Sequence, residues 1–246
     1  MPRWCCDMLA GSRKKKAEGA EVPAKRRRGG RDEEEERERP MVLDLGNGSE
    51  VLYFQKFIGC EDSWAFFDYL NARIPWSRPT LRVFGRSCLQ PRESCYVAAP
   101  GLPELVYSGH KPHVYSWDEH PPLKQILDAV HRRLPGSRFN SVLLNRYGGG
   151  GDNVGWHADD EKIYGEAPEI ASVSLGCERD FLLKKRRSTA AEGGEARRRG
   201  ERHSLCLEHG SLLVMRGYTQ RDWLHSVPKR AGAPAARINL TFRLVF

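Results

Sequence analysis

The chain has 246 residues, with 39% hydrophobic and 29% charged side chains and a formal net charge of +8. That length suits one domain of about 200 residues plus additional segments, and no apolar run approaches the ~18 residues that a membrane-spanning helix needs. The seven cysteines are an odd number without a C-x-x-C pair, so the composition argues against a secreted disulfide scaffold and favours a reducing compartment.

The first 40 residues are rich in charge and lack apolar periodicity. They carry 12 basic and 9 acidic side chains, with RKKK at Arg13, KRRR at Lys25 and DEEEE at Asp32. Such composition is typical of disorder, so we expect residues 1–40 to form a disordered tail with basic and acidic clusters. The two basic clusters resemble a two-part nuclear import signal and predict a nuclear protein.

Helical periodicity is strongest in the first half of the remaining chain. Residues 61–74 (EDSWAFFDYLNARI) predict one helix, and residues 121–136 (PPLKQILDAVHRRLPG) predict a second. The second segment has prolines at its start and Pro-Gly after its end. Its apolar residues recur with helical spacing at Leu123, Ile126, Leu127, Val130 and Leu134.

From residue 141 onward the pattern changes to short strands. Apolar runs separated by Gly, Pro or polar breaks occur at Ser141–Tyr147, Ile170–Leu175, Asp180–Lys185, Ser204–Glu208, Ser211–Met215 and Arg237–Phe246. The four glycines at 148–151 predict only a flexible loop after the first strand. Helices followed by many short strands indicate an α+β domain built on a sandwich or jelly roll.

A second basic segment interrupts two of these strands. Residues 184–203 hold 8 basic and 3 acidic side chains, and their low-complexity part, 186–203, predicts a mobile basic insert in a domain of residues 41–246. Together with the tail, this segment accounts for the whole net charge. Lys and Arg on peripheral segments favour a polyanion partner, because they release counterions from phosphates. Solubility alone is the alternative explanation.

The last strand separates an apolar face from a polar one by simple alternation. The apolar residues are Ile238, Leu240, Phe242 and Leu244, and the polar residues are Arg237, Asn239, Thr241 and Arg243. The polar face is either exposed to solvent or turned into the interior of a sandwich. In the interior, its two guanidiniums would hold a small dicarboxylate.

The stretch WHADDE (Trp156–Glu161) contains an H-x-D motif. In an extended segment, the side chains of His157 and Asp159 point the same way and are able to share a metal. His225, in the later stretch WLHSVP, offers a third ligand. Two histidines and one carboxylate are typical of non-haem Fe(II) oxygenases, whereas zinc on the same residues would serve hydrolysis. A hydrolase does not need the paired-arginine strand, so iron is favoured.

The order of these motifs resembles the AlkB family of Fe(II)- and 2-oxoglutarate-dependent dioxygenases, most of all its nuclear, duplex-DNA repair type. The resemblance covers roughly Arg82 to Phe246 and implies a double-stranded β-helix (jelly-roll) core with flanking N-terminal helices. It rests on N-R-Y (Asn145–Tyr147), W-H-A-D-D-E, I-A-S-V-S-L-G (Ile170–Gly176), R-D-F (Arg179–Phe181), H-G-S-L-L-V-M (His209–Met215), W-L-H-S-V-P (Trp223–Pro228) and R-I-N-L-T-F-R.

The resemblance implies a role for each matching residue in the site. The Fe(II) ligands would be His157, Asp159 and His225. The two carboxylates of 2-oxoglutarate would be held by Asn145, Tyr147, Arg237, Thr241 and Arg243. Asp160 and Glu161 would face the substrate base and accept hydrogen bonds from its exocyclic amine.

The family also places a hydrophobic wedge in the stretch LRVFGRS. Here Val83, Phe84 and Gly85 would enter the base stack and fill the gap that a flipped base leaves. A core strand is the alternative for a Val-Phe pair.

The base pocket would be lined by the stretch LVYSG, with Tyr107 stacked on the flipped base and Leu105 and Ser108 beside it. The family has an aromatic residue where this chain has Leu105, which puts the base preference in question. Arg92 would hold phosphates without reading the base sequence.

The sequence therefore predicts a DNA repair dioxygenase that demethylates 1-methyladenine and 3-methylcytosine and releases formaldehyde. The reaction would use Fe(II), 2-oxoglutarate and O2. The base must leave the duplex, because the methyl group lies on its Watson–Crick edge. We expect a nuclear monomer with no membrane association. The alternatives are an RNA demethylase of the same fold and a catalytically inactive nucleic-acid binder.

Overall fold

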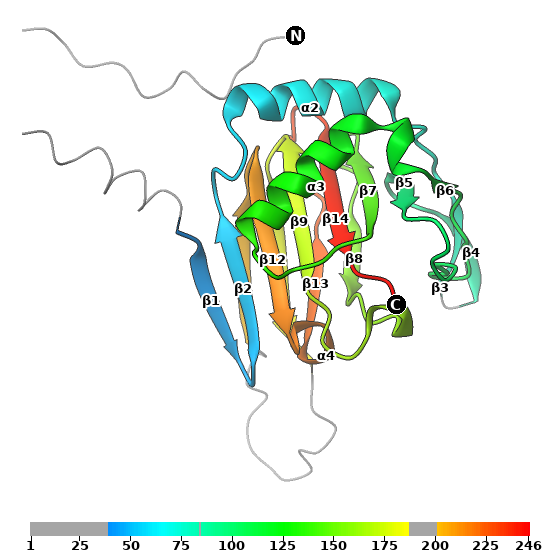
Figure 1. The fold of residues 1–246 in the computed structure, drawn as a ribbon. Coiled ribbons are helices and arrows are strands. Elements are labelled where there is room, and N and C mark those ends of the chain that lie inside the picture. The colour runs from blue at the N-terminus through cyan, green and yellow to red at the C-terminus, as the bar shows by residue number, and fades with distance from the viewer. Residues whose placement is uncertain (1–38, 84, 187–200) are drawn as a thin grey trace, which may run out of the picture. The chain divides into compact units, whose positions relative to one another are not determined.

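Two larger β-sheets and a separate hairpin form the framework of the described chain (Figure 1). The computed structural model describes residues 39–83, 85–186 and 201–246. Residues Pro40–Phe246 form one of the two units into which the chain divides. The tail expected at residues 1–40 lies outside the described residues, apart from Arg39 and Pro40. Among the described helices, none has the length and apolar character needed to cross a membrane.

The major sheet has eight strands, and all neighbouring pairs are antiparallel except the parallel pair β5–β6. In spatial order the strands are β1 (Met41–Gly46), β2 (Ser49–Phe54), β12 (Ser211–Gly217), β9 (Ile170–Gly176), β14 (Arg237–Arg243), β7 (Ser141–Tyr147), β5 (Glu93–Ala98) and β6 (Val114–Tyr115). The final strand therefore lies at the centre of the sheet, where both of its edges are paired.

The minor sheet has four strands. They are, in spatial order, β11 (Arg202–Leu207), β10 (Arg179–Lys185), β13 (Trp223–Val227) and β8 (Val154–His157). The hairpin consists of β3 (Thr80–Val83) and β4 (Arg86–Leu89). Three short helical turns connect strands, namely η1 (Trp117–Glu119), η2 (Lys162–Tyr164) and α4 (Thr219–Asp222).

Two helices, α2 (Cys60–Arg73) and α3 (Pro121–Arg133), cover one face of the major sheet (Figure 1). The stripe that the sequence predicts on α3 supplies the buried residues Leu123, Ile126 and Val130. They pack in one apolar cluster with residues from the sheet, among them Ile238 and Leu240 of β14. The apolar face of the last strand therefore looks toward the helices.

The opposite face of the major sheet packs on the minor sheet through a second apolar cluster. Leu213 and Met215 of β12 belong to it, together with Phe181 and Leu183 of β10 and Trp223 of β13. Since alternate residues of a strand point to opposite faces, the polar residues of β14 look into the space between the sheets.

The α+β jelly-roll fold that the sequence predicts is confirmed. Both predicted helices form, and each of the six predicted strands matches an observed one within a few residues. The pattern did not predict β1, β2, β4, β5, β6 or β13. Of the predicted insert, residues 187–200 lie outside the described part, while Arg202 and His203 already belong to β11.

Candidate active site

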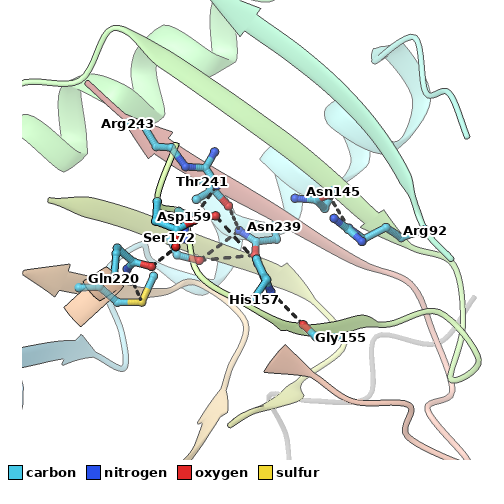
Figure 2. A network of polar contacts seen from close by, with 12 residues as sticks. Arg92, Asn145, Gly155, His157, Asp159, Ser172, Gln220, Asn239, Thr241 and Arg243 are labelled. Carbon is cyan, nitrogen blue, oxygen red and sulfur yellow. Dashed lines mark hydrogen bonds and ion pairs between the residues drawn. The ribbon is translucent and has the colours of Figure 1, made fainter. Parts of the chain in front are cut away.

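The polar face of β14 is buried, which decides between the two orientations that the alternation left open. Arg237, Asn239, Thr241 and Arg243 are exposed by only 1 to 8%. Side-chain hydrogen bonds connect them along and across the strands. Arg237 Nη2 donates to Ser174 Oγ at 2.9 Å. Asn239 Nδ2 donates to Ser172 Oγ at 3.1 Å and to Thr241 Oγ1 at 3.2 Å (Figure 2). The central position of β14 thus holds these side chains in fixed register.

The three candidate metal ligands meet at the edge of the minor sheet. His157 is the last residue of β8 and pairs directly with His225 of β13, so the two rings lie on the same face with centroids 4.2 Å apart. Asp159 follows two residues later. One ligand atom from each of the three side chains lies within 4.8 Å of the others. This spacing suits a single ion bound by two histidines and one carboxylate.

The electrostatics keep His225 and Asp159 in the form that binds metal. Burial, together with the adjacent His157 ring, lowers the pKa of His225 to about 3, so its imidazole is neutral at neutral pH. Burial raises the pKa of Asp159, but the guanidinium of Arg243 and the imidazoles of His225 and His157 lower it by more. The Asp159 pKa therefore lies well below its usual range, and the carboxylate is charged.

The ligands open onto a cavity of about 580 Å³ between the two sheets. Residues from all three sheets and from the loops between them line it. The predicted site residues among them are Arg92, Leu105, Tyr107, Ser108, Asn145, Tyr147, His157, Asp159, Asp160, Glu161, His225 and Arg243. A cavity of this size accommodates a small cofactor together with part of a substrate.

Arg237 and Thr241 belong to the same buried face but do not line the cavity directly. The guanidinium of Arg237 lies against the ring of Tyr147, 5.2 Å from its centroid. Its Nε and Nη1 atoms are buried without a hydrogen-bond partner, and burial lowers the pKa of this arginine. A buried cation with free donors is costly unless an anion completes it, so the residues present fit a carboxylate of a small dicarboxylic acid.

Arg243 already has an anionic partner. Its Nη2 lies 3.0 Å from Asp159 Oδ2, with both side chains less than a tenth exposed. The same guanidinium has a buried Nε without a hydrogen-bond partner. Arg243 therefore connects the candidate metal ligand to the space where a second carboxylate would bind.

The two acids after Asp159 differ in their surroundings. Asp160 is largely exposed and pairs with Arg186 Nη2 at 2.6 Å, so in this state its carboxylate is occupied. Glu161 is partly buried, and its Oε2 has no hydrogen-bond partner. Burial and the nearby Asp159 raise the pKa of Glu161. Both residues line the cavity, as the sequence predicts for groups that face a substrate.

Arg92 is half-buried and lines the cavity. Its Nε donates to Asn145 Oδ1 at 2.7 Å, inside the cavity (Figure 2). Tyr107 and Ser108 lie at a tight turn, where the backbone of Tyr107 pairs with that of His110. Leu105 is buried in a small apolar cluster with Tyr96 and Leu143.

The predicted wedge is only partly described. Val83 ends β3, and Gly85 follows with a φ of +76°, a conformation that favours glycine at the tip of a hairpin. Phe84 lies outside the described residues. The alternative of a core strand does not fit the partner strand β4, because all four of its residues are exposed.

Sequence reasoning missed several residues that shape the site. Ser172 and Ser174 alternate along β9 as the polar residues of β14 do, so their spacing could have placed them on the cavity side. Tyr164 and Gln220 had no such signal, because both lie on short helical turns. Gln220 accepts a hydrogen bond from the backbone N–H of Asp159 at 3.0 Å.

Comparison with known proteins agrees with this geometry. The model of the 2OG-Fe(II) oxygenase superfamily matches residues 50–243. The DNA oxidative demethylase ALKBH2 of Arabidopsis thaliana is 64% identical over 216 residues, which cover 83% of this chain and 69% of the relative. The chain belongs to the AlkB branch of the 2OG-Fe(II) oxygenases. Fe(II) and 2-oxoglutarate are therefore its cofactors, and it is a dioxygenase.

More distant AlkB proteins match as well. The human alpha-ketoglutarate-dependent dioxygenase alkB homolog 3 is 34% identical over 80% of this chain and 67% of its own length. Human DNA oxidative demethylase ALKBH2 is 39% identical over 67% of this chain and 60% of its own length. The solved structure of OsALKBH1 covers 82% of this chain and all of its own, with a TM-score of 0.51 and 18% identity. At that identity it supports the fold alone.

Proposed function

We propose that this AlkB-family chain is a DNA repair dioxygenase that removes N-methyl groups from bases such as 1-methyladenine and 3-methylcytosine. The observation that carries the proposal is the convergence of His157, Asp159 and His225 on one cavity with the buried, incompletely bonded guanidiniums of β14. Two relatives, from Arabidopsis thaliana and from human, are named DNA oxidative demethylase, which supports DNA as the substrate.

In the proposed site, His157, Asp159 and His225 bind Fe(II). Arg237 and Arg243 hold the two carboxylates of 2-oxoglutarate, because guanidiniums match carboxylates in charge and shape. Asn145, Tyr147 and Thr241 complete the cofactor pocket through polar contacts. When bound, the two cofactors would supply, together with O2, the oxidation of the N-methyl group: one oxygen atom of O2 enters the succinate that forms as 2-oxoglutarate loses CO2, the other gives a hydroxymethyl group, and this group leaves as formaldehyde.

The substrate base enters from the side of the hairpin. Tyr107 offers a ring for stacking, with Leu105 and Ser108 beside it, and base–aromatic stacking contributes about 1–3 kcal/mol per base. Asp160 and Glu161 line the same cavity as this ring and the metal ligands. They accept hydrogen bonds from the exocyclic amine of adenine or cytosine, while Arg186 releases Asp160 when the base arrives.

Access to a paired base requires its extrusion from the duplex. We propose that Val83, Phe84 and Gly85 at the hairpin tip fill the gap, and that Arg92 together with the basic insert at 186–203 contacts the backbone. The enzyme acts as a monomer. The two basic clusters in the tail direct it to the nucleus.

Formaldehyde release tests the proposal. The full chain with Fe(II) and 2-oxoglutarate is compared on methylated duplex DNA, single-stranded DNA and RNA of one base sequence. We expect release from DNA, at a rate on the duplex at least equal to that on the single strand. Faster turnover of RNA would favour the RNA demethylase. Absence of release from all three, with both cofactors bound, would favour the inactive binder.

A further inference from the structure

Asp159 differs from the two histidines in how its backbone is held. The pairing of β8 with β13 reaches His157, which lies opposite His225, and β8 ends there. Asp159 lies two residues beyond, in a segment without strand structure. The sheet therefore fixes two of the three candidate ligands directly, and the third needs another support.

Gln220 of α4 provides a contact to this segment. The backbone N–H of Asp159 donates to Gln220 Oε1 at 3.0 Å, and both residues are buried, at 7% and 1% exposure. The amide nitrogen of Gln220 points the other way and donates to Met215 Sδ at 3.3 Å (Figure 2). The two contacts orient the amide so that its oxygen faces Asp159.

The position of α4 links the separate ligand segments. Its residues lead directly into β13, which carries His225. The backbone oxygen of Gln220 also accepts from Arg186 Nη2 at 3.3 Å, and that guanidinium pairs with Asp160. Gln220 therefore supports the segment after His157 at two consecutive residues, once directly and once through Arg186.

The other contact of Asp159 depends on the state of the cofactor site. Its Oδ2 is paired with Arg243, which in the proposed site also holds 2-oxoglutarate. When 2-oxoglutarate accepts hydrogen bonds from the Arg243 guanidinium, the ion pair of that guanidinium with Asp159 becomes weaker. The bond to Gln220 involves the Asp159 backbone instead, so it persists while the carboxylate changes partners.

We propose that Gln220 is a positioning residue that fixes the backbone of the metal ligand Asp159 and thereby sets the affinity of the site for its metal. This inference rests on the ligand assignment proposed above. Groups that orient metal ligands contribute about 10- to 100-fold to metal affinity, so the loss of the Gln220 oxygen is expected to weaken binding by about tenfold.

The test measures the affinity of the metal-free full chain for Mn(II), a redox-stable probe of the Fe(II) site, by electron paramagnetic resonance titration. Gln220→Met keeps the volume and removes the acceptor, and it should weaken Mn(II) binding about tenfold. Gln90→Met is the matched control. Gln90 is also fully buried and hydrogen-bonded through its side chain, to Arg92 O and Ser94 Oγ, so its loss should lower the melting temperature and leave Mn(II) affinity unchanged.

A second variant separates an acceptor from a space-filling side chain. Gln220→Glu keeps an oxygen for the Asp159 N–H but adds a charge to a buried position. If Gln220 acts as an acceptor, the Glu variant binds Mn(II) more tightly than the Met variant. If Gln220 only fills space, the Met variant should bind Mn(II) as tightly as the wild type, or more tightly than the Glu variant. Either result would contradict the proposal.

Two further measurements distinguish the possible failures. Asp159→Ala should abolish Mn(II) binding; unchanged binding would overturn the ligand assignment and this inference with it. Loss in Asp159→Ala with normal affinity in Gln220→Met would overturn this inference alone. Amide hydrogen exchange on the unmutated, metal-free protein requires no variant: the Asp159 N–H should exchange slowly, and exchange at the rate of a free loop amide would contradict the bond.

Discussion

The two ends of the cavity are built differently. The deep end is formed by β14 and by the candidate metal ligands around the end of β8 and on β13. β14 is paired on both edges and every one of its residues is buried, and β13 is likewise paired on both edges. The rim, formed by the β3–β4 hairpin and the Tyr107–His110 turn, is a two-stranded ribbon in which all of β4 is exposed. Isolated hairpins of this kind are only marginally stable by themselves.

The difference indicates a division of work. Chemistry at the deep end requires groups held in fixed geometry, and a central strand supplies that because its register is set on both sides. In the proposed function, the rim recognises the nucleic acid. That requires a surface that reaches into the nucleic acid and tolerates sequence change, and an exposed hairpin provides it. Substitutions at the deep end should therefore affect cofactor binding, whereas those at the rim should affect the choice of substrate.

One loop connects the two ends. Asp152 pairs with Arg78, just before the hairpin, at 3.2 Å, and the N–H of Asn153 donates to Pro91 O at 3.0 Å. On the other side, the guanidinium of Arg179 donates to the backbone oxygens of Gly149, Asp152 and Pro228. The loop after β7 thus ties the rim to the sheets.

The largest effect is expected from Arg237→Met at the deep end. Loss of a buried charged partner costs about 2–5 kcal/mol in binding, so the affinity for 2-oxoglutarate should fall at least about 30-fold by calorimetric titration. The melting temperature should stay the same or rise, because the free protein no longer buries an incompletely bonded cation.

Arg243→Met is the matched control for that change. It also removes a guanidinium from β14, but it leaves the Asp159 carboxylate buried without its partner. Breaking a buried pair in this way costs about 3–5 kcal/mol, so this variant should unfold at a lower temperature. A fall in melting temperature of equal size in both variants would contradict the view that Arg237 awaits an anion.

The connecting loop should show an intermediate effect. A Cβ at Gly150 would lie 2.1 Å from Arg230 O, whereas a Cβ at Gly151 would meet nothing within 4 Å. Overpacking of this kind costs about 2 kcal/mol, so Gly150→Ala should lower the melting temperature by about 5 °C. Gly151→Ala should leave it nearly unchanged. Equal melting temperatures would show that the loop adapts and does not tie the two ends together.

The smallest of the three effects is expected at the rim. If Phe84 fills the gap left by a flipped base, Phe84→Ala should slow demethylation of duplex DNA about tenfold, the rate equivalent of about 1.4 kcal/mol of lost stacking. Turnover of single-stranded DNA should stay within about twofold. Leu89→Ala, on the same hairpin and 61% exposed, is the control without duplex selectivity. Equal losses on both substrates in Phe84→Ala would contradict the wedge.

Local patterns in the sequence determined a large part of this protein. The α3 stripe and the alternation along β14 each depend on spacings of a few residues, and the structure confirms the helix and the strand they predict. The H-x-D motif is only half in a strand, because β8 ends at His157 and Asp159 lies two residues beyond it. Such patterns persist because a helix or strand repeats its side-chain directions regardless of what surrounds it. The need for a third ligand pointed to His225, and the family resemblance implied the same residue.

Only the tertiary structure decided how these elements face each other. Alternation assigns Arg237 and Arg243 to the polar face of β14. Because the apolar face packs on α2 and α3, the polar face is turned into the space between the two sheets. The glycine run predicted only a flexible loop, yet Gly150 is where two loops meet at close contact.

The contacts of Arg92 with Asn145 and of Gln220 with Asp159 join residues more than 50 positions apart. They depend on how strands and turns from different sheets come together in space. Local periodicity in a single sequence does not predict such contacts. The period of a strand or helix fixes the directions of side chains within one element, but not the distances between two elements.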